Sequence, residues 1–241
     1  MTIAALVACS SPDGTTNTTD AAETNSSWQE PKSVAPDPLL GVPITDGAIA
    51  QSSLLTAAEL PEGYIEIPDP VRDLGLDPAP EYDSPDRSGT QPQLCADVLA
   101  PVSQQYPGTS ADAVVRYSGP NFSSIDEDAA SYTDNGAAQA FDAVQDTFAA
   151  CVDFTGTDAD GIDVDYNLEP RDQETVGDAS TSVQLTTTSE GFSLVSEAVL
   201  AVVDHTVVQV VVTSLEGADA AAVTDLARDA VDKIRGANTG V

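Results

Sequence analysis

The densest group of potential metal ligands in the sequence is a run of acidic residues in the middle of the chain. Its members are Asp158, Asp160, Asp163, Asp165 and Glu169. Ca²⁺ prefers carboxylate oxygens, and an acid at the twelfth position of a loop is also found in EF-hands. The match fails at two positions, because aspartate replaces the turn glycine at the sixth and Ile162 occupies the fifth. We expect a solvated acidic loop, with a calcium site as the weaker alternative.

Acid–base catalysis usually depends on histidine, and this sequence contains only one, His205. Asp204 precedes it, but this pair alone does not make a catalytic triad. We expect His205 to be an exposed residue of a hairpin turn. The sequence also has no G-x-S-x-G, H-E-x-x-H or G-x-x-x-x-G-K-[ST] motif and no Cys/His cluster with zinc spacing. We therefore expect no enzyme and no cofactor, and hydrolysis by paired carboxylates is the weakest alternative.

The first cysteine has the surroundings of a lipid-attachment site. Residues 3–8 form a short apolar run that ends in Leu6-Val7-Ala8-Cys9, and two serines follow. This pattern resembles a bacterial lipobox, in which the cysteine is lipidated on sulfur and becomes the mature N-terminus. Because a basic n-region and a longer apolar stretch are missing, residues 1–8 look like a truncated signal peptide. We predict lipidation at Cys9, and the alternative is a chance cysteine in a tail.

The other two cysteines, Cys95 and Cys151, are available to pair with each other. One disulfide uses two of the three cysteines, and lipid attachment at Cys9 accounts for the third. In an oxidising compartment the simplest outcome is a Cys95–Cys151 disulfide. A bridge that closes a loop of about 57 residues stabilises the folded chain by about 4 kcal/mol in the chain-entropy model. Two buried free thiols are the alternative.

The segment after Cys9 has the composition of a tether. Ser, Thr, Asn, Asp, Gly, Ala and Glu dominate residues 10–27, and four prolines follow by residue 43. Such a composition buries too little apolar surface to offset chain entropy, and the prolines stiffen the approach to the domain. Trp28 lies in this segment, and we expect its side chain to be exposed unless it anchors the tail to the domain. We therefore predict a signal remnant (1–8), a disordered tether (9–50) and a folded domain (51–236).

Apolar periodicity in the folded part predicts helices and strands in a mixed order. The predicted helices are 52–60, 93–105 with a kink at Pro101, 136–151 and 219–235. The predicted strands are 112–117, 179–188, 192–203 and 206–214. A proline-rich surface loop is expected over 61–92. Because short links join the last three strands, they should form an antiparallel sheet with helices packed on one face, an α+β fold.

Some of these features recur together in a known family. They are Leu54-Leu55-Thr56 with Leu60-Pro61, a helix opened by Cys95, a later helix ending in Phe148 to Cys151, and the final hairpin and helix. Over residues 52–235 the chain thereby resembles the extracytoplasmic sensor-type domain of PknH-type receptor kinases of mycobacteria, also found in free actinobacterial lipoproteins. The resemblance implies helices and a sheet that frame a cleft, and binding of an unidentified envelope ligand. The chain departs from the family in having cysteines for one disulfide instead of two, and no kinase.

The charge of the chain narrows the choice of partners. Forty acidic residues against eight basic ones give a net charge of −32. Such a polyanion is repelled by nucleic acid and anionic headgroups, and its surface favours a soluble monomer and fits salt adaptation. No run approaches the roughly 18 apolar residues of a membrane span, so contact with the membrane is expected only through the N-terminal lipid.

These observations together predict an extracytoplasmic lipoprotein, anchored to the outer face of the cell membrane. Its domain is expected to bind a small molecule, a glycan or a protein. A carrier that encloses a lipid or glycolipid is the alternative, although the small aliphatic inventory makes a wide apolar cavity hard to line.

Overall fold

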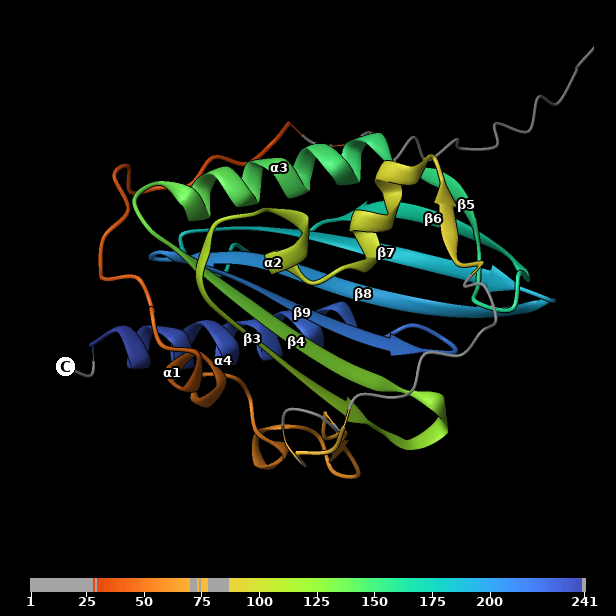
Figure 1. Ribbon diagram of the computed structural model, residues 1–241, viewed down its shortest axis with the longest axis horizontal. Helices are drawn as coiled ribbons and strands as arrows, with labels where there is room; N and C mark the ends of the chain where they lie inside the picture. The colour runs from red at the N-terminus through yellow and green to blue at the C-terminus, as the bar shows by residue number, and fades with distance from the viewer. Residues whose placement is uncertain (1–27, 29, 70–72, 74, 78–86, 240–241) are drawn as a thin grey trace, which may run out of the picture.

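A nine-stranded antiparallel sheet forms the centre of the molecule (Figure 1). The computed structural model describes residues 28, 30–69, 73, 75–77 and 87–239, and Cys9 with the signal remnant lies outside them. The strands, in the spatial order β1-β3-β4-β9-β8-β7-β6-β5-β2, are β1 (Ile65–Glu66), β2 (Gly89–Gln91), β3 (Thr109–Ser118), β4 (Ser124–Tyr132), β5 (Asp153–Thr157), β6 (Asp163–Arg171), β7 (Ala179–Ser189), β8 (Phe192–Val203) and β9 (Thr206–Ser214). The antiparallel sheet and the α+β class are confirmed.

Seven helical segments surround the sheet in the described part of the chain. They are α1 (Gly47–Ser52), α2 (Val102–Gln105), α3 (Gly136–Ala150), α4 (Ala220–Thr239) and the 3-10 helices η1 (Ala57–Glu59), η2 (Gln93–Leu99) and η3 (Pro120–Phe122). In the described residues, no helix has the length and apolar character needed to cross a membrane. Pro101 separates η2 from α2, as expected from a residue that lacks a backbone N–H.

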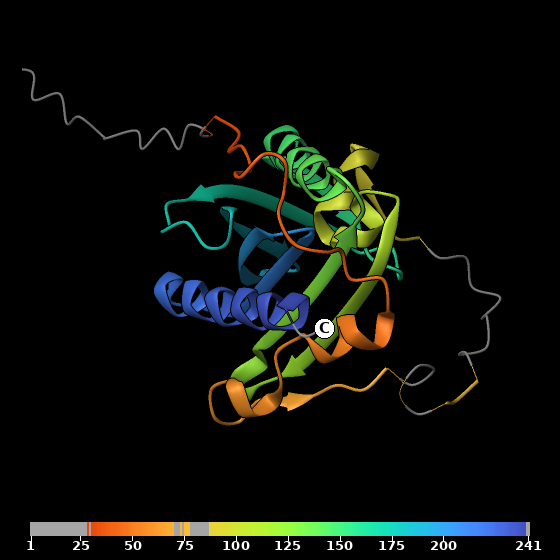
Figure 2. The same cartoon turned by 90° about the vertical axis from the view of Figure 1, so that its left-hand side faces the viewer.

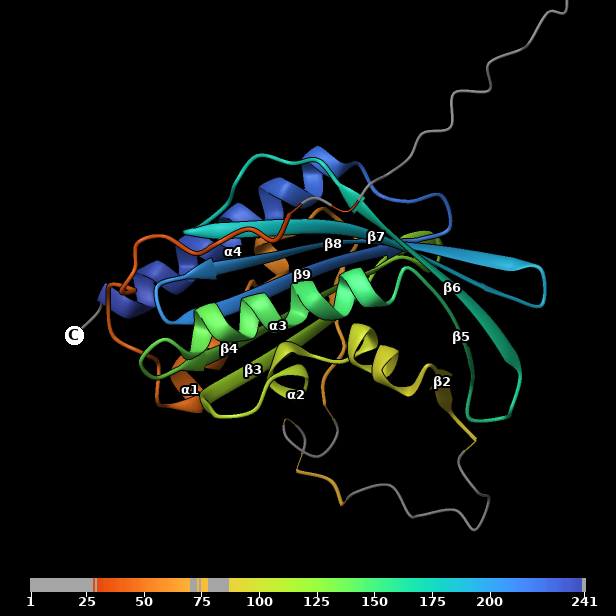
Figure 3. The same ribbon diagram turned by 90° about the horizontal axis from the view of Figure 1, so that it is seen from above.

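The long helices divide between the two faces of the sheet, which differs from the expected packing on one face. Helix α4 covers one face and α3 lies across the other (Figure 3). Val199 and Val203 of β8 belong to the core under α4, whereas Leu200 and Val202 belong to the core under α3. A strand with apolar residues at both alternating sets of positions needs cover on both faces, and β8 and β9 have this pattern.

Strands β1, β2, β4, β5 and β6 were not predicted, and β1 and β2 lie within the expected loop 61–92. The sequence of β4, SIDEDAASY, contains three consecutive acids and breaks the apolar alternation used to recognise strands. It nevertheless pairs with β3 over residues 109–118 and with β9 over residues 206–213. Backbone pairing with two neighbouring strands therefore outweighs the unfavourable local sequence.

The predicted tether is too long at its C-terminal end. Residues 30–50, the N-terminal arm, run from α3 across the end of the sheet to α1 (Figure 2). Leu39, Ile44 and Ala50 are buried against the domain, and Trp28 packs partly against the core under α3. The prediction of disorder failed here because it weighed composition, whereas a few spaced apolar side chains suffice when distant segments supply their pockets.

Gln145 of α3 holds the arm by two hydrogen bonds to one residue. Its Oε1 accepts from the backbone N–H of Lys32 at 2.8 Å and its Nε2 donates to the carbonyl of Lys32 at 3.0 Å. Gln145→Ala should lower the free energy of unfolding by about 1–2 kcal/mol and increase amide hydrogen exchange at Lys32. Asp146→Ala, exposed on the same helix, is the control. Unchanged exchange in Gln145→Ala would show that the two bonds contribute nothing to docking.

Candidate ligand-binding cleft

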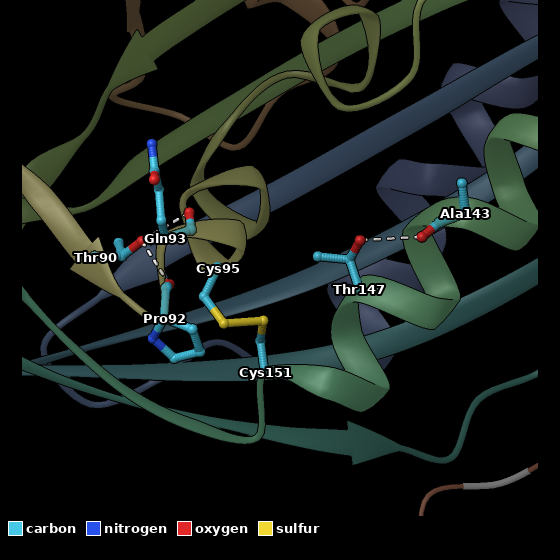
Figure 4. Close-up of a disulfide and its surroundings, with 7 residues drawn as sticks. All are labelled: Thr90, Pro92, Gln93, Cys95, Ala143, Thr147 and Cys151. Carbon is cyan, nitrogen blue, oxygen red and sulfur yellow. Dashed lines mark hydrogen bonds between the residues drawn. A yellow bond between two sulfur atoms is a disulfide. The ribbon is translucent and has the colours of Figure 1, made fainter.

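A disulfide holds the wall of the cleft in place. Cys95 of η2 and Cys151 at the end of α3 are joined with an S–S distance of 2.05 Å and a Cα–Cα distance of 5.6 Å, which confirms the predicted pairing (Figure 4). Both cysteines are fully buried. At the start of η2 the Thr90 hydroxyl oxygen lies 3.0 Å from the carbonyl of Pro92 and 3.2 Å from that of Gln93. Segment 93–101 is therefore fixed over the face of the sheet that α3 also covers.

Between this segment and the sheet lies an open cleft of about 210 Å³. Its lining residues come from η2 and the following loop, from β3, β4 and β9, and from β7 and β8. They are Val98, Leu99, Ala100, Pro101, Val114, Arg116, Asp126, Glu127, Asp128, Leu185, Ser196, Gln209 and Val211. Convergent polar groups among apolar walls are typical of ligand sites.

Asp126 and Asp128 lie on the floor of the cleft. They are two residues apart on β4, so they share one face of the sheet, with Cα atoms about 7 Å apart. The N–H of Val102 donates to Asp128 Oδ1 at 2.8 Å, and Gln209 Nε2 donates to Asp128 Oδ2 at 3.3 Å. Asp126 Oδ2 accepts from the Ser124 hydroxyl at 3.0 Å.

Arg116 is the cation of the cleft. It lies directly opposite Asp126 in the pairing of β3 with β4, and its Nε is 3.4 Å from Asp126 Oδ1. Cross-strand neighbours on one face are close enough for such a pair. Both side chains are substantially exposed, so this ion pair contributes little to stability and is open to rearrangement.

Burial changes the acidity of both aspartates. Asp128 is only 9% exposed, and its desolvation raises the pKa to about 7, opposed by the hydrogen bond from Val102. Desolvation also raises the pKa of Asp126, opposed by the hydrogen bond from Ser124 and by Arg116. Asp128 therefore changes its charge near neutral pH. A strongly perturbed acid in a cleft is a common mark of a functional site.

Glu127 points to the opposite face, under the turn that carries Leu54-Leu55-Thr56. It is 1% exposed, and its Oε2 accepts from the backbone N–H of Leu55 at 2.6 Å. The Tyr117 hydroxyl donates to the carbonyl of Leu55 at 2.7 Å. Desolvation raises the pKa of Glu127 to about 8. The motif therefore has a structural role, because its backbone donates to one oxygen of Glu127 and accepts from the Tyr117 hydroxyl.

The five acids of the calcium candidate do not come together. Asp158 Oδ1 accepts from the backbone N–H groups of Asp160 and Ile162, both at 2.9 Å, and so stabilises the turn between β5 and β6. Glu169 lies six residues after Asp163 along the extended strand β6, a separation of about 20 Å. Among the residues that the structure describes, no group of three or more Cys, His, Asp or Glu has the arrangement of a metal site.

We therefore expect calorimetric titration with millimolar Ca²⁺ to give no binding heat, because an EF-hand holds its ion in one converging loop. Asp163→Asn should leave the titration unchanged. Saturable heat that disappears in Asp163→Asn would contradict the extended course of β6.

His205 occupies the predicted hairpin turn but is not exposed. It is 9% exposed, and its carbonyl accepts from the N–H of Tyr132 at 2.9 Å. The N-terminal arm packs over the turn, because a Cβ atom on Gly41 would lie only 2.9 Å from Asp204 Cγ. In the described structure His205 Nδ1 has no hydrogen-bond partner, which argues against a triad. The prediction that His205 is exposed was wrong, because the N-terminal arm packs over the turn and the local sequence does not indicate this contact.

The floor of the cleft could not be predicted from the local sequence pattern. Asp126 and Asp128 belong to a strand that was not recognised, and Gln209 lies inside a run of valines. One signal in the sequence could have indicated this floor. Val114 and Arg116 are two residues apart on a predicted strand, and Asp128 and Asp126, also two residues apart, pair opposite them.

Comparison with known proteins finds similarity of fold alone. No family model matches the sequence, and no curated protein matches it. The extracellular domain of PknH from Mycobacterium tuberculosis is 16% identical and has a TM-score of 0.58, with 82% of this chain and 100% of that chain covered. An uncharacterised Rv0999 ortholog from Mycobacterium smegmatis is 13% identical, with a TM-score of 0.41 and coverage of 74% and 92%. The chain thus shares the fold of the PknH extracellular domain, while membership of that family stays a prediction.

Proposed function

We propose that this chain is an extracytoplasmic lipoprotein whose domain is of the sensor type and binds a small ligand in the cleft between η2 and the sheet. The observation that carries the proposal is the convergence of Asp126, Asp128, Gln209 and Arg116 on a hollow of about 210 Å³ with apolar walls. In such a site, a small number of polar groups fixes the orientation of the bound molecule, and the apolar walls surround it.

Three observations support the extracytoplasmic location. The fold is that of a domain described as extracellular in Mycobacterium tuberculosis. The Cys95–Cys151 disulfide is typical of oxidising compartments. The sequence around Cys9 resembles a lipobox and would attach the chain to the membrane.

The lipid-carrier alternative has less support. The cleft is smaller than the roughly 300–1,000 Å³ of pockets that enclose drug-sized ligands. A larger hollow of about 620 Å³ at β2, β5 and β6 is lined mainly by Gly, Thr, Gln and Asp. Neither lining suits an acyl chain, which needs an apolar enclosure.

A hydrolase with paired carboxylates also has less support. The pKa of Asp128 near 7 would suit a general acid. However, Asp126 faces Arg116, and both oxygens of Asp128 accept hydrogen bonds from the protein. Turnover of a chromogenic glycoside by the natural protein, lost in Asp128→Asn, would contradict binding without catalysis.

The test is mass spectrometry of protein purified without reductant from the envelope of an actinobacterial host. We expect an acylated Cys9 peptide, a Cys95–Cys151 crosslink and a small adduct in the native spectrum. Ala100→Trp fills the cleft and should remove the adduct, whereas Ala222→Trp on the exposed side of α4 should retain it. Cys9 recovered without lipid would contradict the anchor. An adduct that survives Ala100→Trp would contradict the cleft, and a lipid-sized adduct would favour the carrier.

A further inference from the structure

We propose that the ligand of this cleft is an organic cation, a small molecule with a protonated amine and an apolar body. This inference rests on the proposed function, ligand binding in the cleft, and assigns its ligand class. The binding partners would be the carboxylates of Asp126 and Asp128 on the floor, with the apolar body against segment 98–101.

The first argument is the charge of the cleft lining. Its charged residues are Arg116, Asp126, Glu127 and Asp128, and the Glu127 side chain is engaged by Leu55 on the other face of the sheet. Two carboxylates therefore face the hollow with one guanidinium. The floor is anionic even when Arg116 contacts Asp126.

The second argument concerns Asp128, a buried carboxylate that makes no direct ion pair with a described residue and on which Arg116 acts only through its charge. The described structure gives it hydrogen bonds from Val102 and Gln209 and no ion pair. Burying a carboxylate is costly unless a cation compensates it, and hydrogen bonds from neutral groups compensate only in part. Each carboxylate oxygen retains a further lone pair for an ammonium donor. A bound cation would add a direct ion pair to Asp128 from the open side of the cleft.

The third argument comes from the walls. Val98, Leu99 and Pro101 line the hollow from segment 93–101, and Leu185 and Val211 line it from the sheet. Leu99 is 48% exposed, so apolar surface is available for a ligand to cover. Apolar contact would hold the body of the ligand and exclude water, which strengthens the attraction between ammonium and carboxylate.

The charge of the whole chain acts in the same direction. A net charge of −32 attracts cations towards the surface and repels anions. A charged cleft with apolar walls focuses this field and raises the rate of encounter. Both the net charge of the chain and the charge of the cleft floor therefore disfavour anionic ligands.

The test uses three six-carbon probes that differ in the head group: n-hexylammonium, n-hexanol and n-hexanoate. Each is titrated into ¹⁵N-labelled protein with the disulfide intact at pH 7.5, and the amide shifts of Val102 and Gln209 report on the cleft. We expect hexylammonium to bind at least tenfold more tightly than hexanol, and hexanoate to bind more weakly than both.

Two substitutions should move the affinity in opposite directions. Asp126→Asn removes one carboxylate and leaves Arg116 unpaired, so hexylammonium should bind at least tenfold more weakly. Arg116→Gln frees Asp126 and should tighten binding several-fold. Asp153→Asn on β5 and Arg228→Gln on α4 remove the same charges away from the cleft and are the matched controls.

The outcomes separate the two proposals. Tight hexylammonium binding with both directional effects would support the cation. Equal binding of hexanol or hexanoate would overturn the cation and leave ligand binding in the cleft standing. Equal weakening by Asp153→Asn and Asp126→Asn would overturn it as well, because the effect would then be general electrostatics. Absence of cleft shifts with all three probes would overturn the cation inference and count against the cleft as a site.

Discussion

Glu127→Gln should raise the free energy of unfolding by about 4 kcal/mol at pH 9 and by less than about 1 kcal/mol at pH 5. Burial raises the pKa of Glu127 from 4.5 to about 8, so ionisation is costly in the folded state. Glutamine keeps an oxygen that accepts the N–H of Leu55 and has no charge to bury. The variant therefore removes a cost that the natural protein bears only at higher pH.

The same shift determines how stability depends on pH. Between pH 4.5 and 8 the folded state keeps a proton on Glu127 that the unfolded state has released, so stability falls as the pH rises. The raised pKa of Asp128 also makes stability fall as the pH rises, between its ordinary value of 3.8 and about 7. Above the folded-state pKa values of both groups, the loss of stability levels off. Urea unfolding at pH 5, 7 and 9 measures the slope, which should be smaller in Glu127→Gln.

The control is Glu62→Gln, an exposed glutamate near the same turn, whose effect should stay within about 0.5 kcal/mol at each pH. A Glu127→Gln protein that is less stable than the natural one at pH 9 would contradict the argument. That result would mean that the carboxylate is stabilised in its charged form.

Replacing both Cys95 and Cys151 by alanine should lower the free energy of unfolding by about 4 kcal/mol in the chain-entropy model. The bridge spans a sequence separation of 56 and constrains the unfolded chain accordingly. In the folded state it fastens η2 to the end of α3. Loss of the bridge should also loosen segment 93–101 and weaken binding in the cleft.

Denaturant unfolding measures the first effect, and amide hydrogen exchange across η2 measures the second. Cys9→Ser is the control and should leave both unchanged, since the predicted role of Cys9 is lipid attachment. Unaltered exchange at η2 in the double alanine variant would show that packing around Phe154 alone holds the wall of the cleft.

The parts of the fold that the sequence predicted share one property, an apolar pattern that is complete within one segment. Strand β9 is a nearly continuous run of valine and threonine, β8 ends in the apolar run AVLAVV, and Phe141, Val144 and Phe148 mark one face of α3. Cys151 follows this face, so its burial and its pairing with Cys95 were predictable. Such signals depend only on neighbours in the chain.

The parts that were missed depend on contacts with distant residues. Strand β4 carries three acids and forms because β3 and β9 pair with it on both sides. Residues 30–50 have the composition of a tether and are ordered by packing against α3 and the sheet. The burial of His205 follows from the same arm.

The sequence by itself determined the charge of the protein, the disulfide, the α+β class and the terminal hairpin and helix, because composition and periodicity are local properties. Only the tertiary structure decided the cleft. Asp126 and Asp128 meet Arg116 and Gln209 there because strand pairing joins residues far apart in the chain. Burial in that place raises the pKa of Asp128, since acidity depends on surrounding solvent and charge, which the order of residues does not state.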